Sequence, residues 1–218
     1  MAFRLPNGST LDLAATYAPA VTVTAITNAK PAKCTAVGHT LKAGDIVVLT
    51  SGWVKASGRA YRVGTIVTDT FELEGLDTTS TSKFPVGSSA SSIKKVVTWV
   101  NIPQITSIAS SGGEQQFYTF GFLEEEDDRQ VPTTKSPSLL TLTVADDPQQ
   151  PFVAVVEVAD ETNEERIQRL TLINGDIILY NSIVSMTATP SMTRNQLMEN
   201  TITLAQQGRP TRYRPVGA

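Results

Sequence analysis

The sequence predicts a mainly β protein with a single helix and a small inserted β domain, and three observations predict it. Threonine alternates with valine, leucine or isoleucine in several short runs, which is the period-2 pattern of strands with one buried and one wet face. One segment instead repeats apolar residues at helical spacing. Glycines recur at short intervals between residues 30 and 87, which indicates short strands joined by turns.

Four runs give the clearest strand patterns. Their threonines stand on the side that should face water, where they keep a strand soluble without lowering its β propensity. Asn174-Gly175 then predicts a tight hairpin between the third run and a strand over residues 176–187, because both residues tolerate positive φ. The four runs are residues 21–24, 140–144, 170–172 and 201–204.

Residues 148–160 are predicted to form one amphipathic helix. Asp147 is interpreted as a capping acid, and Pro148 stands at the first helical position, which accepts proline. Valines are mediocre helix formers, so packing against a sheet must supply most of the stability. A buried strand is the alternative interpretation. The apolar positions are Phe152, Val155, Val156 and Ala159.

Residues 30–87 are predicted to form a separate domain that begins at Lys30-Pro31. Its strands are too short and too rich in turns for one face of a large sheet, but they suit a small barrel. The flanking strands, 21–27 and 93–100, would then belong together, so the segment is an insertion that projects outward from the main fold. The predicted division is residues 1–29 and 88–218 for the main domain and residues 30–87 for the insertion.

Composition and charge exclude several function classes. No run approaches the roughly 20 apolar residues of a membrane span. The first ten residues lack the apolar run of a secretory signal, so we expect a protein made and kept in a cytoplasm. Residues 1–100 hold ten Lys and Arg against six Asp and Glu, whereas residues 101–218 hold eight against fifteen. The acidic second half argues against tight nucleic-acid binding but suits a surface past which DNA slides.

The sequence holds no convincing catalytic, cofactor-binding or metal-binding set of residues. Cys34 is the only cysteine and cannot form an internal disulfide, and Cys34 with His39 is too small a set for zinc. His39, the only histidine, would have to serve any Ser-His-Asp or Cys-His mechanism, but its neighbours favour a turn residue. Cys34 is interpreted as a small buried apolar residue. We therefore expect no enzyme and no cofactor.

An acidic run is the strongest charge feature. Five adjacent acids repel one another and avoid burial, so a solvated loop is the first interpretation and a contact with another subunit is the more specific one. Catalytic carboxylates or a calcium site need a fixed geometry, which a contiguous run does not provide. The run consists of Glu124, Glu125, Glu126, Asp127 and Asp128.

A second candidate contact lies near the end of the sequence. Arginine and tyrosine together can bind nucleic acid, but three arginines are a weak electrostatic footprint. An acidic neighbouring subunit is an equally good partner, because arginine pairs bidentately with carboxylates. The candidate subunit-contact residues are Arg209, Arg212, Tyr213 and Arg214.

Three segments of the second half carry a family likeness. Residues 99–108 read WVNIPQITSI and are followed by SGGE at 111–114. Residues 140–148 read LTLTVADDP and precede the predicted helix, and TITLA at 201–205 leads to a glycine-containing end segment. These patterns of strand and turn resemble the lambda-like major tail tube proteins of long-tailed bacteriophages, the siphoviruses, over residues 93–213.

The resemblance implies a β-sandwich flanked by one helix, with six copies closing into a ring and rings stacking into a hollow tube. Phage DNA would pass through this tube on ejection without specific binding, and residues 124–128 would face the lumen or the adjacent ring. The implied partners are the tape measure protein, the tail terminator, and the baseplate or distal tail proteins. The implied location is the virion tail, assembled in the host bacterial cytoplasm.

The predicted insertion has a likeness of its own. AVGHTLKAGDIV at 36–47, RAYRV at 59–63 and TFELEGLD at 70–77 are similar to small SH3-like β modules of phage tail proteins. In that pattern the His-Thr-Leu turn sets the shape of the chain and is not a site.

Two alternatives to a ring-forming subunit remain at this point. One is a monomeric or trimeric β-rich binding module of a phage baseplate or tail fibre, which the mass in solution would distinguish from a ring. The other is an enzyme, which would have to lose its activity when His39 is replaced.

Overall fold

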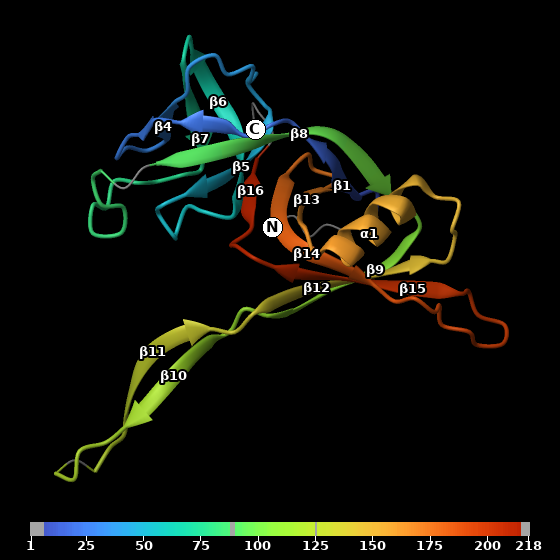
Figure 1. Ribbon diagram of the computed structural model, residues 1–218. Helices are drawn as coiled ribbons and strands as arrows, with labels where there is room; N and C mark the ends of the chain where they lie inside the picture. The colour runs from blue at the N-terminus through green and yellow to red at the C-terminus, as the bar shows by residue number, and fades with distance from the viewer. Residues whose placement is uncertain (1–6, 88–89, 125, 215–218) are drawn as a thin grey trace.

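One antiparallel sheet runs through most of the molecule, and its longest strand joins two parts (Figure 1). The architecture is that of a computed structural model, which describes residues 7–87, 90–124 and 126–214. The first half of β8 (Ser91–Ile102) pairs with strands of one part, the module, and the second half pairs with the other part, the body. A separate two-stranded hairpin, the arm, extends away from both.

The three parts consist of the following elements. The module contains the first half of β8, β2 (Val21–Val23), β3 (Ala25–Ile26), β4 (Ala32–Thr35), β5 (Ile46–Ser51), β6 (Arg59–Val67) and β7 (Thr70–Glu74). The body contains the second half of β8, β1 (Thr10–Tyr17), β9 (Ile105–Gly112), β12 (Ser138–Ala145), α1 (Pro151–Thr162), β13 (Glu165–Thr171), β14 (Ile177–Met186), β15 (Glu199–Gln206) and β16 (Thr211–Tyr213). The arm contains β10 (Gln115–Phe120) and β11 (Arg129–Lys135).

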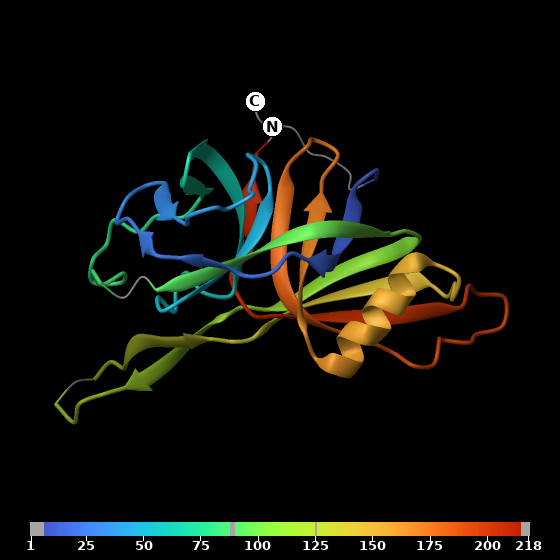
Figure 2. The ribbon, with the colours of Figure 1, turned by 45° about the horizontal axis from the view of Figure 1, so that its top comes forward.

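The body buries its apolar residues between the sheet and α1, which lies across one face of the strands (Figure 2). In β12, Leu140, Leu142 and Val144 are at most 4% exposed, whereas the threonines between them are partly exposed. The predicted strands at 140–144 and 201–204 are therefore confirmed, and they pair with each other as β12 and β15. The predicted mainly β fold with one helix is also confirmed.

The predicted helix forms, so the alternative of a buried strand is wrong, but it begins at Pro151 and not at Pro148. Proline disfavours the helical conformation of the residue before it, and Gln150 is extended accordingly. The prediction that Asp147 caps the helix is also wrong. Its carboxylate instead accepts hydrogen bonds from the Gln149 backbone and the Gln150 side chain, at 3.2 and 2.7 Å, and closes a turn before the helix. The buried residues of α1 are Phe152, Val156 and Ala159.

The hairpin predicted at Asn174-Gly175 joins β13 to β14, with Thr171 opposite Ile177. Gly175 has a φ of +80°, a conformation that glycine adopts without strain. The backbone N–H of Asp176 donates to the Asn174 side-chain oxygen at 3.2 Å, so both turn residues have a defined role.

The module has its own buried cluster, which includes the fully buried Tyr61 and Phe71. Val23, Ile26 and Ile93 belong to the same cluster, and β2 pairs with β8 as expected for the flanking strands. The core of the module thus uses strands on both sides of residues 30–87, and the predicted division of the chain stays a prediction. Three stretches at the ends of the predicted domains lie outside the described residues, namely 1–6, 88–89 and 215–218.

A polar joint fixes the module to the body beside their shared strand. The Tyr213 hydroxyl accepts a hydrogen bond from the Arg62 backbone N–H at 3.0 Å and donates to the Glu74 carbonyl at 2.9 Å. The Arg62 guanidinium lies over the Tyr213 ring, 4.6 Å from its centroid. The side-chain amide of Asn181 donates to the Gly58 carbonyl at 2.9 Å. Burial raises the pKa of Tyr213 to about 12, so this hydroxyl stays protonated at neutral pH.

Two valines of α1 provide a matched test of this packing. Val156 is fully buried and Val158 is 50% exposed. We predict that Val156→Ala lowers the free energy of unfolding by about 2 kcal/mol, because two buried carbons are lost and a cavity remains. Val158→Ala should change it by less than about 0.5 kcal/mol. Urea unfolding of both variants measures the difference, and equal effects would contradict the orientation of the helix.

Candidate functional site

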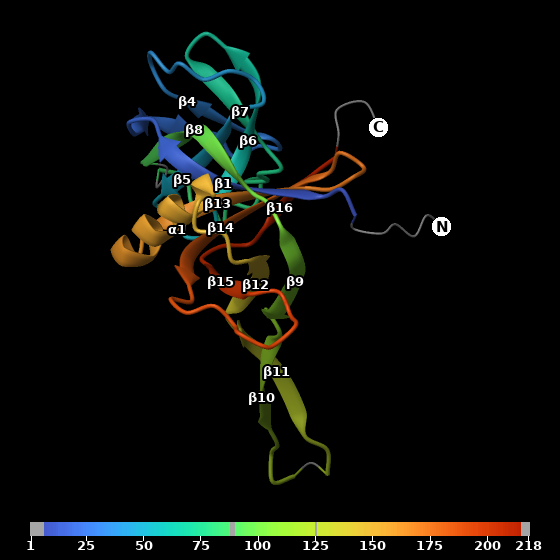
Figure 3. The ribbon, with the colours of Figure 1, turned by 90° about the vertical axis from the view of Figure 1, so that its right-hand side faces the viewer.

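The arm lacks a covering layer among the described residues. β10 and β11 pair only with each other, in a two-stranded sheet that extends from the body (Figure 3). Every residue of β11 is exposed, and so are the middle residues of β10. An isolated two-stranded hairpin is at best marginally stable in water, so a further surface is needed to hold it.

Two glycines lie where the β9–β12 ladder of the body passes into the arm. Gly112 and Gly113 have φ values of +76° and +78°. A Cβ atom at Gly112 would lie 1.9 Å from the carbonyl oxygen of Pro137, which is a direct clash with the opposite chain. Position 112 therefore requires glycine for its conformation and for the close approach of the two chains.

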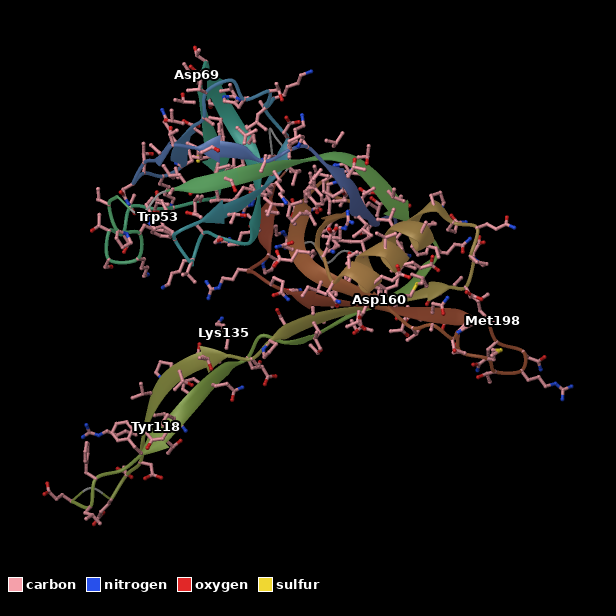
Figure 4. The ribbon with its side chains drawn as sticks, viewed as in Figure 1. Trp53, Asp69, Tyr118, Lys135, Asp160 and Met198 are labelled. Atoms are coloured by element: carbon pink, nitrogen blue, oxygen red, sulfur yellow. The ribbon has the colours of Figure 1, made fainter. Side chains whose placement is uncertain are left out.

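One face of the arm carries a row of aromatic side chains, of which Tyr118 is labelled in Figure 4. The rings of Tyr118 and Phe120 stack with centroids 6.2 Å apart, and Phe120 meets Phe122 edge to face at 5.6 Å. Val131 is the cross-strand partner of Tyr118 and shares its face. Tyr118 is 63% and Phe122 56% exposed. A continuous exposed apolar row of this kind marks a contact surface.

The described residues of the acidic run lie in the turn at the tip of the arm, at the end farthest from the body (Figure 1). Glu124, Glu126, Asp127 and Asp128 are all exposed, and Glu125 lies outside the described residues. Leu123, directly before them, is fully exposed. The tip thus combines negative charge with an uncovered apolar side chain.

A groove of about 760 Å³ lies between the module and the segment that leads into β16. One carboxylate, Asp77, lines it, and this carboxylate already has partners. The Thr79 hydroxyl donates to it at 2.7 Å, which lowers its pKa, and the ammonium of Lys30 lies 3.3 Å away. The excess charge of the groove is therefore positive. The cationic residues that line it are Lys55, Arg59, Lys83 and Arg209.

Two of the four predicted subunit-contact residues are engaged within the chain. Arg212 donates through Nε to Asp176 at 3.0 Å, and this hydrogen bond lowers the pKa of Asp176. Tyr213 is 6% exposed and belongs to the polar joint. Arg209 and Arg214 are exposed, and Arg209 lies at the basic groove. Their contact with another subunit stays a prediction.

His39 and Cys34 lie in structural environments. The backbone N–H of Leu41 donates to Nδ1 of His39 at 3.4 Å, and the His39 ring meets Phe71 edge to face with centroids 5.2 Å apart. Cys34 is fully buried, and burial raises the pKa of its thiol to about 12. A thiol that stays protonated at neutral pH is a poor nucleophile.

Other candidate sites are few in the part of the chain that the structure describes. There, no three His, Cys, Asp or Glu side chains are grouped so that they could hold a metal ion. No helix of that part is long and apolar enough to span a membrane. A cavity of about 400 Å³ beside α1 is strongly acidic. Its acids are Asp146, Asp147, Glu157, Asp160 and Glu161.

An arm with an aromatic face and a charged tip is typical of structural subunits that assemble with other chains. The family comparison agrees with this class, because the sequence model of the phage tail tube protein family matches residues 51–215, more than half of the chain. The chain belongs to the phage tail tube protein family and is a structural component of a phage tail. A search of curated proteins found no match.

The sequence interpretation found the acidic tip but missed the aromatic face. The signal was present, since Tyr118, Phe120 and Phe122 alternate with small residues in the period-2 pattern of a strand. The glycine pair 112–113 marks the base of the arm. The basic groove had no comparable signal, because its residues come from segments more than a hundred positions apart.

Thiol labelling tests the environment of Cys34. We predict that an aromatic disulfide reagent at pH 8 modifies the folded protein at least a hundredfold more slowly than the chain unfolded in urea, because Cys34 is buried and protonated. Absorbance of the released thiolate measures both rates. Labelling of the folded protein within a few-fold of the unfolded rate would show that the module is open at this strand.

Proposed function

We propose that six copies of the chain close into a ring and that the rings stack into the hollow tube of a phage tail. The exposed aromatic face of the arm, on a chain of this family, is the observation that carries the proposal. Burial of an aromatic side chain contributes about 1.5–3 kcal/mol, and assembly provides the surface that the isolated chain lacks. Phage DNA passes through this tube on ejection without specific binding.

An unpaired sheet edge supports the same arrangement. β9 is the last strand of the body's sheet and pairs with β12 on one side only among the described strands. Its residues are mostly exposed, and their backbone groups on the free side are available for a further strand. Closing such edges against neighbouring copies makes rings when the contacts are heterologous and return to the starting copy.

The remaining assignments follow from this arrangement. The acidic second half of the chain would repel DNA from the wall of the lumen, so that DNA slides past it. The tape measure protein, the tail terminator and the baseplate or distal tail proteins are the partners inside the tube and at its ends. Residues 30–87 decorate the outside, and assembly takes place in the host bacterial cytoplasm.

Electron microscopy of the purified protein tests the proposal directly. We predict hollow rings or tubes with six-fold symmetry above a critical concentration. Mass in solution separates this outcome from the alternative of a binding module. A monomer or trimer at every concentration would contradict the proposal.

A matched pair of double variants tests the role of the aromatic face. We predict that Tyr118→Ser with Phe120→Ser raises the critical concentration for assembly at least about tenfold, since apolar contact area is lost in every copy. The stability of the monomer should change by less than about 0.5 kcal/mol per site, as at other surface positions. Val37→Ser with Val67→Ser, at exposed valines of the module, is the control and should leave assembly unchanged. Equal assembly of the two double variants would mean that the arm does not form the contact.

A further inference from the structure

The basic groove has cations without carboxylate partners. Three of them form no ion pair within the described part of the chain, and their side chains are exposed: Lys55, Lys83 and Arg209. Arg59 donates to the Thr211 hydroxyl at 3.3 Å, but its buried Nε has no hydrogen-bond partner. The groove therefore fits a ligand that brings several acceptors and negative charge.

The tip of the arm has the matching chemistry. Its exposed carboxylates supply acceptors that pair with arginine and lysine. Leu123 is fully exposed beside them, and Val54, which lines the groove, is 88% exposed. The tip and the groove thus each combine charged and apolar groups, and the charges of the two surfaces are opposite.

The tip does not reach the groove of its own chain. It lies at the far end of the arm, which leads away from the module in both Figure 1 and Figure 3. The acidic cavity beside α1 would repel the tip, since five carboxylates line it. A groove on another copy is the surface that matches its charge.

We propose that the acidic tip of the arm in one copy docks in the basic groove of a second copy, between its module and body. This inference rests on the proposed assembly and names the contact through which one copy holds the next. Because tip and groove are different surfaces, the contact is heterologous and extends from copy to copy. The groove spans module and body, so a docked tip also binds the two parts of its host together.

Charge reversal on either side tests the contact. Glu126→Lys with Asp127→Lys places two positive charges in the tip, and Lys55→Glu with Lys83→Glu places two negative charges in the groove. Each double variant should raise the critical concentration for assembly at least about tenfold, because like charges then meet. The chain that carries all four changes should assemble more readily than either double variant, since the new lysines of the tip can then pair with the new glutamates of the groove.

Matched controls separate this contact from a general effect of charge. Glu157→Lys with Glu161→Lys reverses two exposed acids on α1, and Lys42→Glu with Lys94→Glu reverses two exposed lysines of the module. Both controls should assemble within about threefold of the original chain. Circular dichroism and urea unfolding establish that each variant folds. If the groove reversal does not fold, Lys55→Gln with Lys83→Gln is used in its place, and weakened assembly is again the expected result.

The outcomes distinguish this inference from the proposed function. Weaker assembly of each double variant, with recovery of assembly in the chain that carries all four changes, supports the contact. If a reversal leaves assembly unchanged, or if the combination does not recover it, the inference is overturned, while assembly of the original chain still supports the tube. If the original chain stays a monomer at every concentration, the proposed function fails as well.

Discussion

The arm is a two-stranded ribbon that exposes aromatic side chains to water. Its backbone hydrogen bonds are made only within the hairpin, and no layer of side chains covers either face among the described residues. An isolated two-stranded ribbon of this kind is only marginally stable in water. The row formed by Tyr118, Phe120 and Phe122 adds apolar area that favours association. A chain with such an arm is therefore completed by contact with other chains.

The body gives this arm a fixed direction. β9 and β12 pair over seven residue positions in the body, and residues 113–114 and 136–137, which lie outside strands, connect them to β10 and β11. The close approach at Gly112 leaves no room for a side chain and fixes the spacing of the two chains where they leave the sheet. β12 is itself anchored, because its buried residues pack in the core beneath α1. The tip thus lies at the far end of a hairpin that leaves the sheet from an anchored strand pair.

The module is fixed to the body by a shared strand, a buried cluster and hydrogen bonds. The two parts share β8, and a separate buried cluster lies where they meet, with Ala14, Ile46 and Leu179 among its members. The hydrogen bonds of Tyr213 join strands from opposite ends of the sequence. A surface made by both parts, such as the basic groove, therefore keeps a constant shape, which favours a specific contact because little ordering is needed on binding.

Local sequence patterns predicted local structure, but they could not predict which distant segments of the chain pair. The alternation of threonine with leucine identified β12 and β15, and Asn174-Gly175 identified the hairpin, because each depends on a few adjacent residues. The start of α1 was misplaced because two prolines compete, and Pro151 excludes Gln150 from the helix. The acidic run was visible as a charge feature, but its place at the end of an arm depends on the pairing of β10 with β11. The groove depends on the contact of residues 54–84 with residues 207–209, which no periodicity reveals.

Hydrogen–deuterium exchange of the arm, measured in the monomer and in the assembled state, tests whether neighbouring copies cover it. We expect that the backbone amides of β10 and β11 exchange rapidly in the dilute monomer and become strongly protected on assembly, while the amides of β12 and β15 are protected in both states. Equally rapid exchange of the arm in both states would contradict the claim that neighbouring copies cover it.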